Sequence, residues 1–267
     1  YAAPGNLVVF DPVAGGYVST HAIPLGQDGT DLDPGDFLAG QTNLSNHRRG
    51  MNVLPRQTRH SLFTALRQDL GSRLELSADA RYGQRRYETV SAPTATLLTV
   101  NGGHPYFASP TGTASHTIAY SFENDLPNPG IRGEAESFGA SVGARIDLSG
   151  DWTLDAYVAH ASERTDNETF GALNSTFLRE ALGAIADNPA TPYSAARDGF
   201  FNPFGGGGVS SLAVLAFISS GWTHSQAETG VSSANLQLDG PLFALPGGDI
   251  RLAAGLAFRE ETFWRRN

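Results

Sequence analysis

The stretch from Ser137 to Ala159, SFGASVGARIDLSGDWTLDAYVA, decides the fold of this chain. Apolar side chains occupy every second position up to Leu148, and the same alternation resumes at Trp152. Alternation with a period of two is typical of a β-strand that has one apolar and one polar face. The residues between the two runs, Ser149–Asp151, favour turns. The stretch therefore predicts two long antiparallel strands joined by a tight turn.

The length of this turn sets the register of the two strands. A turn of three residues places Leu148 opposite Trp152 and keeps the apolar side chains on one face. On the polar face, Arg145 then lies opposite Asp155, and such a pair of opposite charges stabilises a sheet by roughly 0.2–1 kcal/mol. The apolar face carries Phe138, Ala140, Val142, Ala144, Ile146, Leu148, Trp152, Leu154, Ala156 and Val158.

Two further strand pairs follow the same pattern. The runs Leu62–Leu70 and Leu74–Tyr82 surround a three-residue turn that keeps their apolar residues on one face. A looser pair, Ser233–Asp239 and Ile250–Phe258, surrounds a Pro/Gly-rich turn expected at Gly240–Gly248. The polar faces of the first two pairs carry Arg67, Asp69, Asp79, Arg81, Arg145 and Asp155.

The segments between these pairs are rich in Gly, Pro, Asn and Asp and are expected to form long connections. A short helix near Ala172–Ala186 is expected from the helical spacing of its apolar residues. The predicted organisation is residues 1–57 mostly loop with a short strand near Leu7, 58–88 hairpin, 89–131 loop with a short strand at His116–Phe122, 132–168 hairpin, 169–221 long loop with the helix, and 222–265 hairpin.

Composition excludes several classes of protein. The 267 residues include no cysteine, so neither a disulfide nor a thiolate metal site can form. The net charge of −9 does not suit a nucleic-acid-binding protein, which needs a basic surface. The longest apolar run, Leu212–Ile218, is far shorter than the ~20 residues of a membrane-spanning helix.

Three features favour a transmembrane β-barrel. The strands reach the ~9–11 residues that a tilted barrel strand needs to cross a bilayer. Tight turns after Leu70 and Leu148 alternate with long connections after Tyr87 and Glu163, as in outer-membrane barrels. Aromatic residues such as Trp152 lie near strand ends, where barrels have their aromatic girdles. We therefore expect the apolar face to contact outer-membrane lipid and the polar face to line a lumen.

Five segments, in order along the chain, resemble the β-barrel region of TonB-dependent receptors of proteobacteria such as sphingomonads. The first segment resembles the family's IP.G..G..L...D, and the second resembles its loop-to-strand junction. The third resembles NPYFVNPTGT, with His104 in place of the usual asparagine, and the fourth resembles FNPFGDG. The last resembles DGPLFDLPGGPVRLAVGAEYRRE. The segments are IPLGQDGTDLDPGDF (Ile23–Phe37), NVLPRQTRHSLFTALRQDL (Asn52–Leu70), HPYFASPTGT (His104–Thr113), FFNPFGGG (Phe200–Gly207) and LDGPLFALPGGDIRLAAGLAFREETF (Leu238–Phe263).

The resemblance implies a fold and a function. The fold is an all-β, antiparallel transmembrane barrel of roughly 22 strands, of which this chain would supply six to eight, with long extracellular loops. The function is uptake of a scarce solute across the outer membrane, such as a siderophore, cobalamin or an oligosaccharide, with energy from the inner-membrane TonB system. The implied partners are lipid, the solute, an N-terminal plug domain that is absent from these residues, and TonB acting through the plug.

Two other classes remain open. A soluble extracellular β-sandwich, such as a lectin-like or adhesin-like binding module, predicts an internal core formed by Phe138, Val142, Ile146, Leu154 and Val158. An outer-membrane enzyme predicts a small catalytic group at the rim, for which His160, Glu163 and Asp166 are the candidates. No Gly-x-Ser-x-Gly motif is present, and we expect no enzymatic activity.

No catalytic, cofactor or metal site is assigned. No two of the seven histidines have the i, i+4 spacing of a helical zinc site, and Gly205–Gly208 lacks the Lys-Ser/Thr of a phosphate-binding loop. Aromatic residues in the long connections could stack on a sugar or siderophore, or pack a loop against the barrel wall. Packing against the wall is the preferred interpretation, and ligand-contact residues stay unassigned. These aromatic residues are Tyr106, Phe107, Phe200, Phe201 and Phe204.

Overall fold

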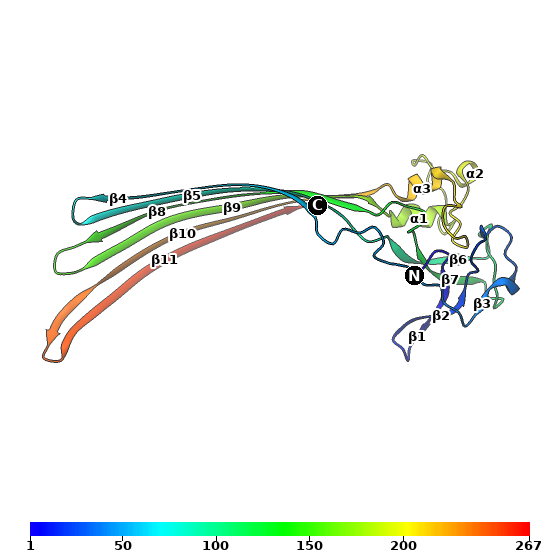
Figure 1. The fold of residues 1–267 in the computed structure, drawn as a ribbon, viewed down its shortest axis with the longest axis horizontal. Coiled ribbons are helices and arrows are strands. Elements are labelled where there is room, and N and C mark those ends of the chain that lie inside the picture. The colour runs from blue at the N-terminus through cyan, green and yellow to red at the C-terminus, as the bar shows by residue number, and fades with distance from the viewer. The chain divides into compact units, whose positions relative to one another are not determined.

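The computed structural model describes all residues from Tyr1 to Asn267 and is built mainly from antiparallel β-strands (Figure 1). The predicted all-β, antiparallel class is confirmed. The chain divides into two compact units, each assembled from three separate segments. Residues 1–55, 89–131 and 169–223 form one, which we name the loop unit; residues 56–88, 132–168 and 224–267 form the other, which we name the strand unit.

The strand unit is a single sheet of six long strands in the order β11-β10-β9-β8-β5-β4 (Figure 1). The strands are 15 to 25 residues long. Their bounds are β4 Arg56–Leu70, β5 Leu74–Val90, β8 Gly130–Asp147, β9 Thr153–Ala172, β10 Gly221–Leu245 and β11 Gly248–Arg266. The sheet is open, because β4 and β11 each have one neighbour, and the chain forms no closed barrel. A barrel of roughly 22 strands therefore stays a prediction.

The two predicted three-residue turns are present. Leu70 pairs with Leu74 and Leu62 pairs with Tyr82, so the apolar residues of β4 and β5 share one face. In the turn between β8 and β9, the Leu148 N–H donates to the Trp152 carbonyl at 2.7 Å. The expected ion pair on the polar face is not formed, since neither Arg145 nor Asp155 makes a salt bridge.

The prediction of a nine-residue turn at Gly240–Gly248 is wrong. Strand β10 continues to Leu245, which pairs with Gly248 across a two-residue turn. The register shifts between Pro241 and Phe243, so one extra residue forms a bulge. A bulge tolerates proline, which has no N–H to donate to the ladder. The Pro/Gly-rich composition thus indicates an irregularity inside a strand and not the end of one.

The loop unit contains more regular structure than its sequence suggests. It has a five-stranded sheet in the order β3-β2-β1-β7-β6, with strands β1 Asn6–Asp11, β2 Gly16–Ala22, β3 Leu38–Ala39, β6 Ala95–Asn101 and β7 Ser115–Ser121. Its helices are the 3₁₀ turn Pro34–Asp36, α1 Ser175–Ala181, α2 Ala195–Asp198 and α3 Leu212–Ile218. Strand β7 corresponds to the strand expected at His116–Phe122, and α1 is shorter than the helix expected at Ala172–Ala186. None of the helices is both long enough and apolar enough to span a membrane.

The buried hydrophobic core lies entirely in the loop unit. Its largest fully buried side chains include Tyr120 in β7, Phe122 directly after β7, and Phe201 and Phe204 from the segment between α2 and α3. The Tyr120 ring packs edge-to-face against both Phe122 and Phe201, with centroids 5.2 Å and 5.6 Å apart. The strand unit contributes no residue to this cluster. Its side chains therefore lie on the two open faces of one sheet.

Candidate functional site

The apolar face of the strand unit is the first candidate surface. The five side chains that a soluble sandwich would bury are not buried: Phe138 is 47% exposed, Val142 is 56% exposed and Val158 is 58% exposed, while Ile146 and Leu154 are half-buried. No second layer of this chain covers them. A shallow groove of about 410 Å³ on this face is lined mainly by alanine, valine, leucine and phenylalanine from five strands. The face offers apolar contact over a wide area.

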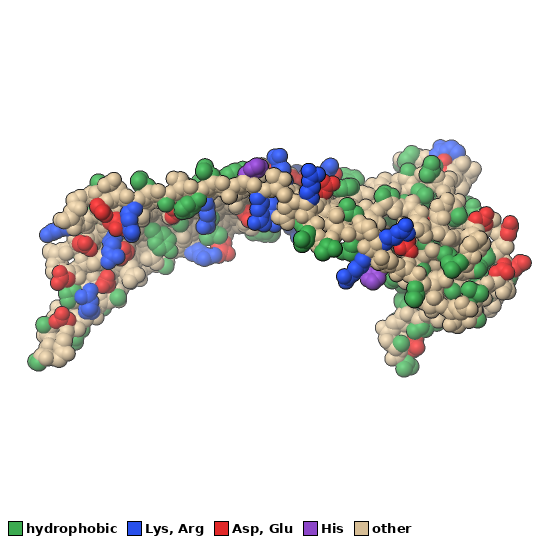
Figure 2. Space-filling model, in the orientation of Figure 1, with side chains coloured by type: hydrophobic (Ala, Val, Ile, Leu, Met, Phe, Trp, Pro, Cys, Tyr) green, Lys and Arg blue, Asp and Glu red, His purple; other side chains and the backbone are tan.

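The same face changes character along the strands. Further along β4, β5, β8 and β9, the positions on this face carry charged residues instead of apolar ones. We name these residues the charged band: Arg56, Arg86, Glu88, Arg132, Glu134, Glu136, Arg164, Asp166 and Glu168. Arg86 bonds to Glu134 at 3.2 Å and Arg132 bonds to Glu168 at 2.7 Å, in both cases across adjacent strands. The Tyr82 hydroxyl, at the border of the two regions, donates to Glu136 at 3.1 Å. Figure 2 shows such mixed charges and hydrophobic side chains on the open surface of the long strands.

The charged band encloses a hollow of about 610 Å³. Apart from Asp166, these residues are not among the candidate residues predicted from the sequence. The alternation in the sequence could have identified them, because they continue the parity of the apolar runs beyond Leu62, Tyr82 and Phe138. Because cations and anions alternate in the charged band, their ion pairs connect adjacent strands. The charged band also places a polar surface next to an apolar one.

The opposite face of the sheet is polar. Along β8 it carries small residues, and larger side chains of the neighbouring strands lie over them. A Cβ added at Gly139 would lie 2.8 Å from Arg81 Nε, and one added at Gly143 would lie 2.8 Å from Ser77 Oγ. Polar contacts cross the strands here: Arg67 bonds to Glu75 at 2.7 Å, and the Ser141 hydroxyl donates to Asp79.

The rim candidates do not form a catalytic group. His160 Nδ1 hydrogen-bonds to Ser232 Oγ at 3.0 Å, and Asp166 bonds to His224 at 2.8 Å. Glu163 has the opposite parity in β9 and therefore lies on the other face of the sheet. No group of three or more histidine, aspartate or glutamate side chains is placed to hold a metal ion.

The loop aromatics mostly serve the core of the loop unit. Phe201 and Phe204 are fully buried. Phe107 stacks on His116 with ring centroids 5.5 Å apart, and Phe200 packs edge-on against His104 at 5.6 Å. These rings therefore contact other residues of the loop unit, whereas the preferred interpretation placed them against the barrel wall.

His104 joins two of these segments. It is buried, and its Nε2 lies 3.1 Å from the Phe201 carbonyl, to which it donates. The Tyr106 N–H donates to the other ring nitrogen at 3.3 Å, so the imidazole is neutral. Burial lowers the pKa of His104 to about 4.

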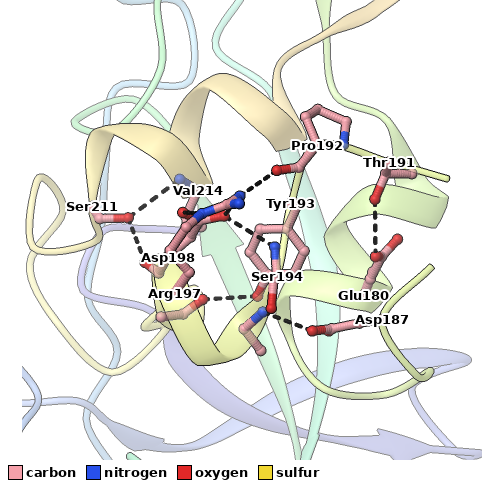
Figure 3. Close-up of polar contacts among 12 residues, drawn as sticks. Glu180, Asp187, Thr191, Pro192, Tyr193, Ser194, Arg197, Asp198, Ser211 and Val214 are labelled. Carbon is pink, nitrogen blue, oxygen red and sulfur yellow. Dashed lines mark hydrogen bonds and ion pairs between the residues drawn. The ribbon is translucent and has the colours of Figure 1, made fainter. Parts of the chain in front are cut away.

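Polar side chains around α1, α2 and α3 hold the connections between these helices (Figure 3). The buried Glu180 accepts the Asn188 N–H at 2.7 Å, and the Tyr193 hydroxyl donates to the Gly199 carbonyl at 2.8 Å. A hydrogen bond from Arg197 lowers the pKa of Asp198 to about 2. These groups act within the loop unit and do not converge on an open pocket.

Comparison with known proteins adds no relative: no family profile matches the sequence, and neither a curated protein nor a solved structure is similar to the chain.

Proposed function

We propose that this chain supplies wall strands and external loops of an outer-membrane β-barrel of the TonB-dependent receptor class. Such a receptor takes up a scarce solute, for example a siderophore, cobalamin or an oligosaccharide, with energy delivered by TonB through a plug domain. In this proposal the strand unit crosses the membrane and the loop unit forms the external part. Lipid, plug, TonB and solute are the proposed partners, and no enzymatic activity is proposed.

One observation carries the proposal: a single-layer sheet of long strands leaves its apolar face uncovered. In water such a face is unstable, because large exposed apolar patches associate with one another. In a bilayer the same face is solvated by lipid, and the opposite polar face is solvated by water in the lumen of the barrel. Strands of 15 to 25 residues exceed the ~9–11 needed to cross, so they extend beyond the membrane.

The order of turns and connections also supports a barrel wall. The turns after Leu70, Asp147 and Leu245 are two to five residues long and lie at one end of the sheet. The segments that enter or leave the sheet at its other end belong to the loop unit and are tens of residues long. Outer-membrane barrels have short turns on the periplasmic side and long loops outside. The five segments that resemble receptor sequences point to the same class.

A pair of neighbouring cysteine variants tests the proposal in the parent protein, in its native membrane. This chain has no cysteine, so Val142→Cys and Ser141→Cys each add one spin-labelling site to it, on opposite faces of β8. We expect oxygen, which partitions into lipid, to relax the label at residue 142 more strongly. A water-soluble nickel chelate is expected to relax the label at residue 141 more strongly.

The soluble sandwich predicts another outcome. Residue 142 would then be shielded from both relaxation agents, and the parent protein would stay in the aqueous phase without detergent. That result would reject the barrel.

A further inference from the structure

Two arginines lie directly opposite each other on the polar face of the strand unit. Arg59 of β4 pairs with Arg85 of β5 in the sheet register. Like charges at opposite positions of adjacent strands repel and destabilise the pair. Neither guanidinium forms an ion pair with a carboxylate of this chain, and neither does Arg81, which lies on the same face of β5. These three arginines therefore place positive charge on this part of the face without a direct ion pair.

A groove of about 380 Å³ adjoins the arginine pair. Gly83, Ala135 and Ser137 are among the residues that line it, and their small size leaves the space open. Glu163 of β9 lines it as well. The Arg85 guanidinium lies 5.1 Å from the centre of the Tyr87 ring, a cation–π contact that orients it. The groove thus has two basic groups from β4 and β5, and one acidic group from β9.

We propose that this groove binds an anionic solute, with a carboxylate or phosphate group held between Arg59 and Arg85. Guanidinium groups bind both anions through paired N–H donors, and an anion between them removes the repulsion. Glu163 accepts hydrogen bonds from hydroxyl or ammonium groups of the same solute. The volume suits a small molecule. This inference rests on the proposed function, because it requires the polar face to border water inside the barrel.

The local potential at Ser137 tests the inference. In the parent protein in its native membrane, Ser137→Cys is treated with an anionic and a cationic methanethiosulfonate reagent of similar size. We expect the anionic reagent to react faster, by roughly fiftyfold for a potential of about two kT, because the potential attracts one reagent and repels the other. Inorganic phosphate or citrate is expected to slow both reagents by occupying the groove. Adding Arg59→Gln and Arg85→Gln should abolish the preference and the protection.

A matched pair of substitutions controls for the loss of two charges. Arg67→Gln and Arg251→Gln remove two arginines of the same face that already bond to Glu75 and Asp239. These changes should leave both effects intact. A faster cationic reagent overturns the inference. So does an anionic preference without protection, because the positive groove would then serve an acidic protein segment. If neither reagent reacts, Ser137 does not face water, and the proposed function fails instead.

Discussion

At the scale of single residues, His104 links the stability of the loop unit to pH. Its folded pKa of about 4 lies below the ordinary histidine value of 6.5, because burial disfavours the charged ring. The unfolded chain therefore binds more protons than the folded chain between these two values. The contribution of His104 to stability is complete above pH 6.5, falls as the pH drops to 4 and is constant below that. Two and a half pKa units correspond to about 3 kcal/mol.

Hydrogen exchange measures this effect. Exchange protection of the segment from Phe107 to Phe122 should fall between pH 6.5 and pH 4 after correction for the intrinsic rate. His104→Gln should flatten this dependence, since glutamine can donate to the Phe201 carbonyl without titrating. The exposed His47→Gln is the control and should keep the parental pH dependence. Unchanged protection at pH 4.5 in the parental chain would contradict the assignment.

At the scale of elements, α1 depends on its N-cap. The Asn174 side chain accepts the N–H groups of Thr176 and Phe177 at 3.0 and 3.1 Å. A helix of seven residues is not stable by propensity alone, so the loss of this cap should clearly destabilise α1. Asn174→Ala should lower the local opening free energy of α1 by about 1 kcal/mol. Exchange of these two amides reports the change.

Asn174→Asp supplies the matched control, because aspartate caps helices about as well as asparagine. It should keep the protection of the two amides close to the parental level. Equal loss in both variants would mean that the cap is not what holds the first turn.

The strands and turns differ in how well the sequence predicts them. The parity of Phe138 to Val158 predicts the strands and the turn between them, because one open face needs one apolar residue at every second position. The short strand predicted near Leu7 is confirmed as β1, whereas β2 and β6 lie in segments that the sequence predicts to be loop. The pairing of β1 with β7 joins residues far apart in the sequence, so the pattern of residues does not show that these segments form one sheet. The composition around Pro241 predicts a turn, because composition alone does not distinguish a bulge within a strand from a turn. The arginine pair of the groove was missed for a related reason: Arg59 and Arg85 meet only once the register is known.

At the scale of the whole molecule, the strand unit has two ways to associate in water. The outer strands β4 and β11 each have an unpaired edge, and the sheet has an uncovered apolar face. We expect the isolated chain, diluted from denaturant into plain buffer, to form oligomers or aggregates. Sedimentation velocity measures this. A monomer that unfolds cooperatively would contradict both the expectation and the lipid-facing role of the sheet.

Two matched double variants separate the face from the edges. Leu66→Lys with Leu256→Lys places two charges on the apolar face of β4 and β11, where these leucines are 65% and 74% exposed. Ala65→Lys with Ala257→Lys places the same charges on the polar face of the same strands. If the apolar face drives association, only the leucine variant stays soluble, because it alone interrupts the hydrophobic contact. If edge pairing dominates, the two variants behave alike. Selective solubility of the leucine variant would show that this face needs an apolar environment, as a surface in contact with lipid does.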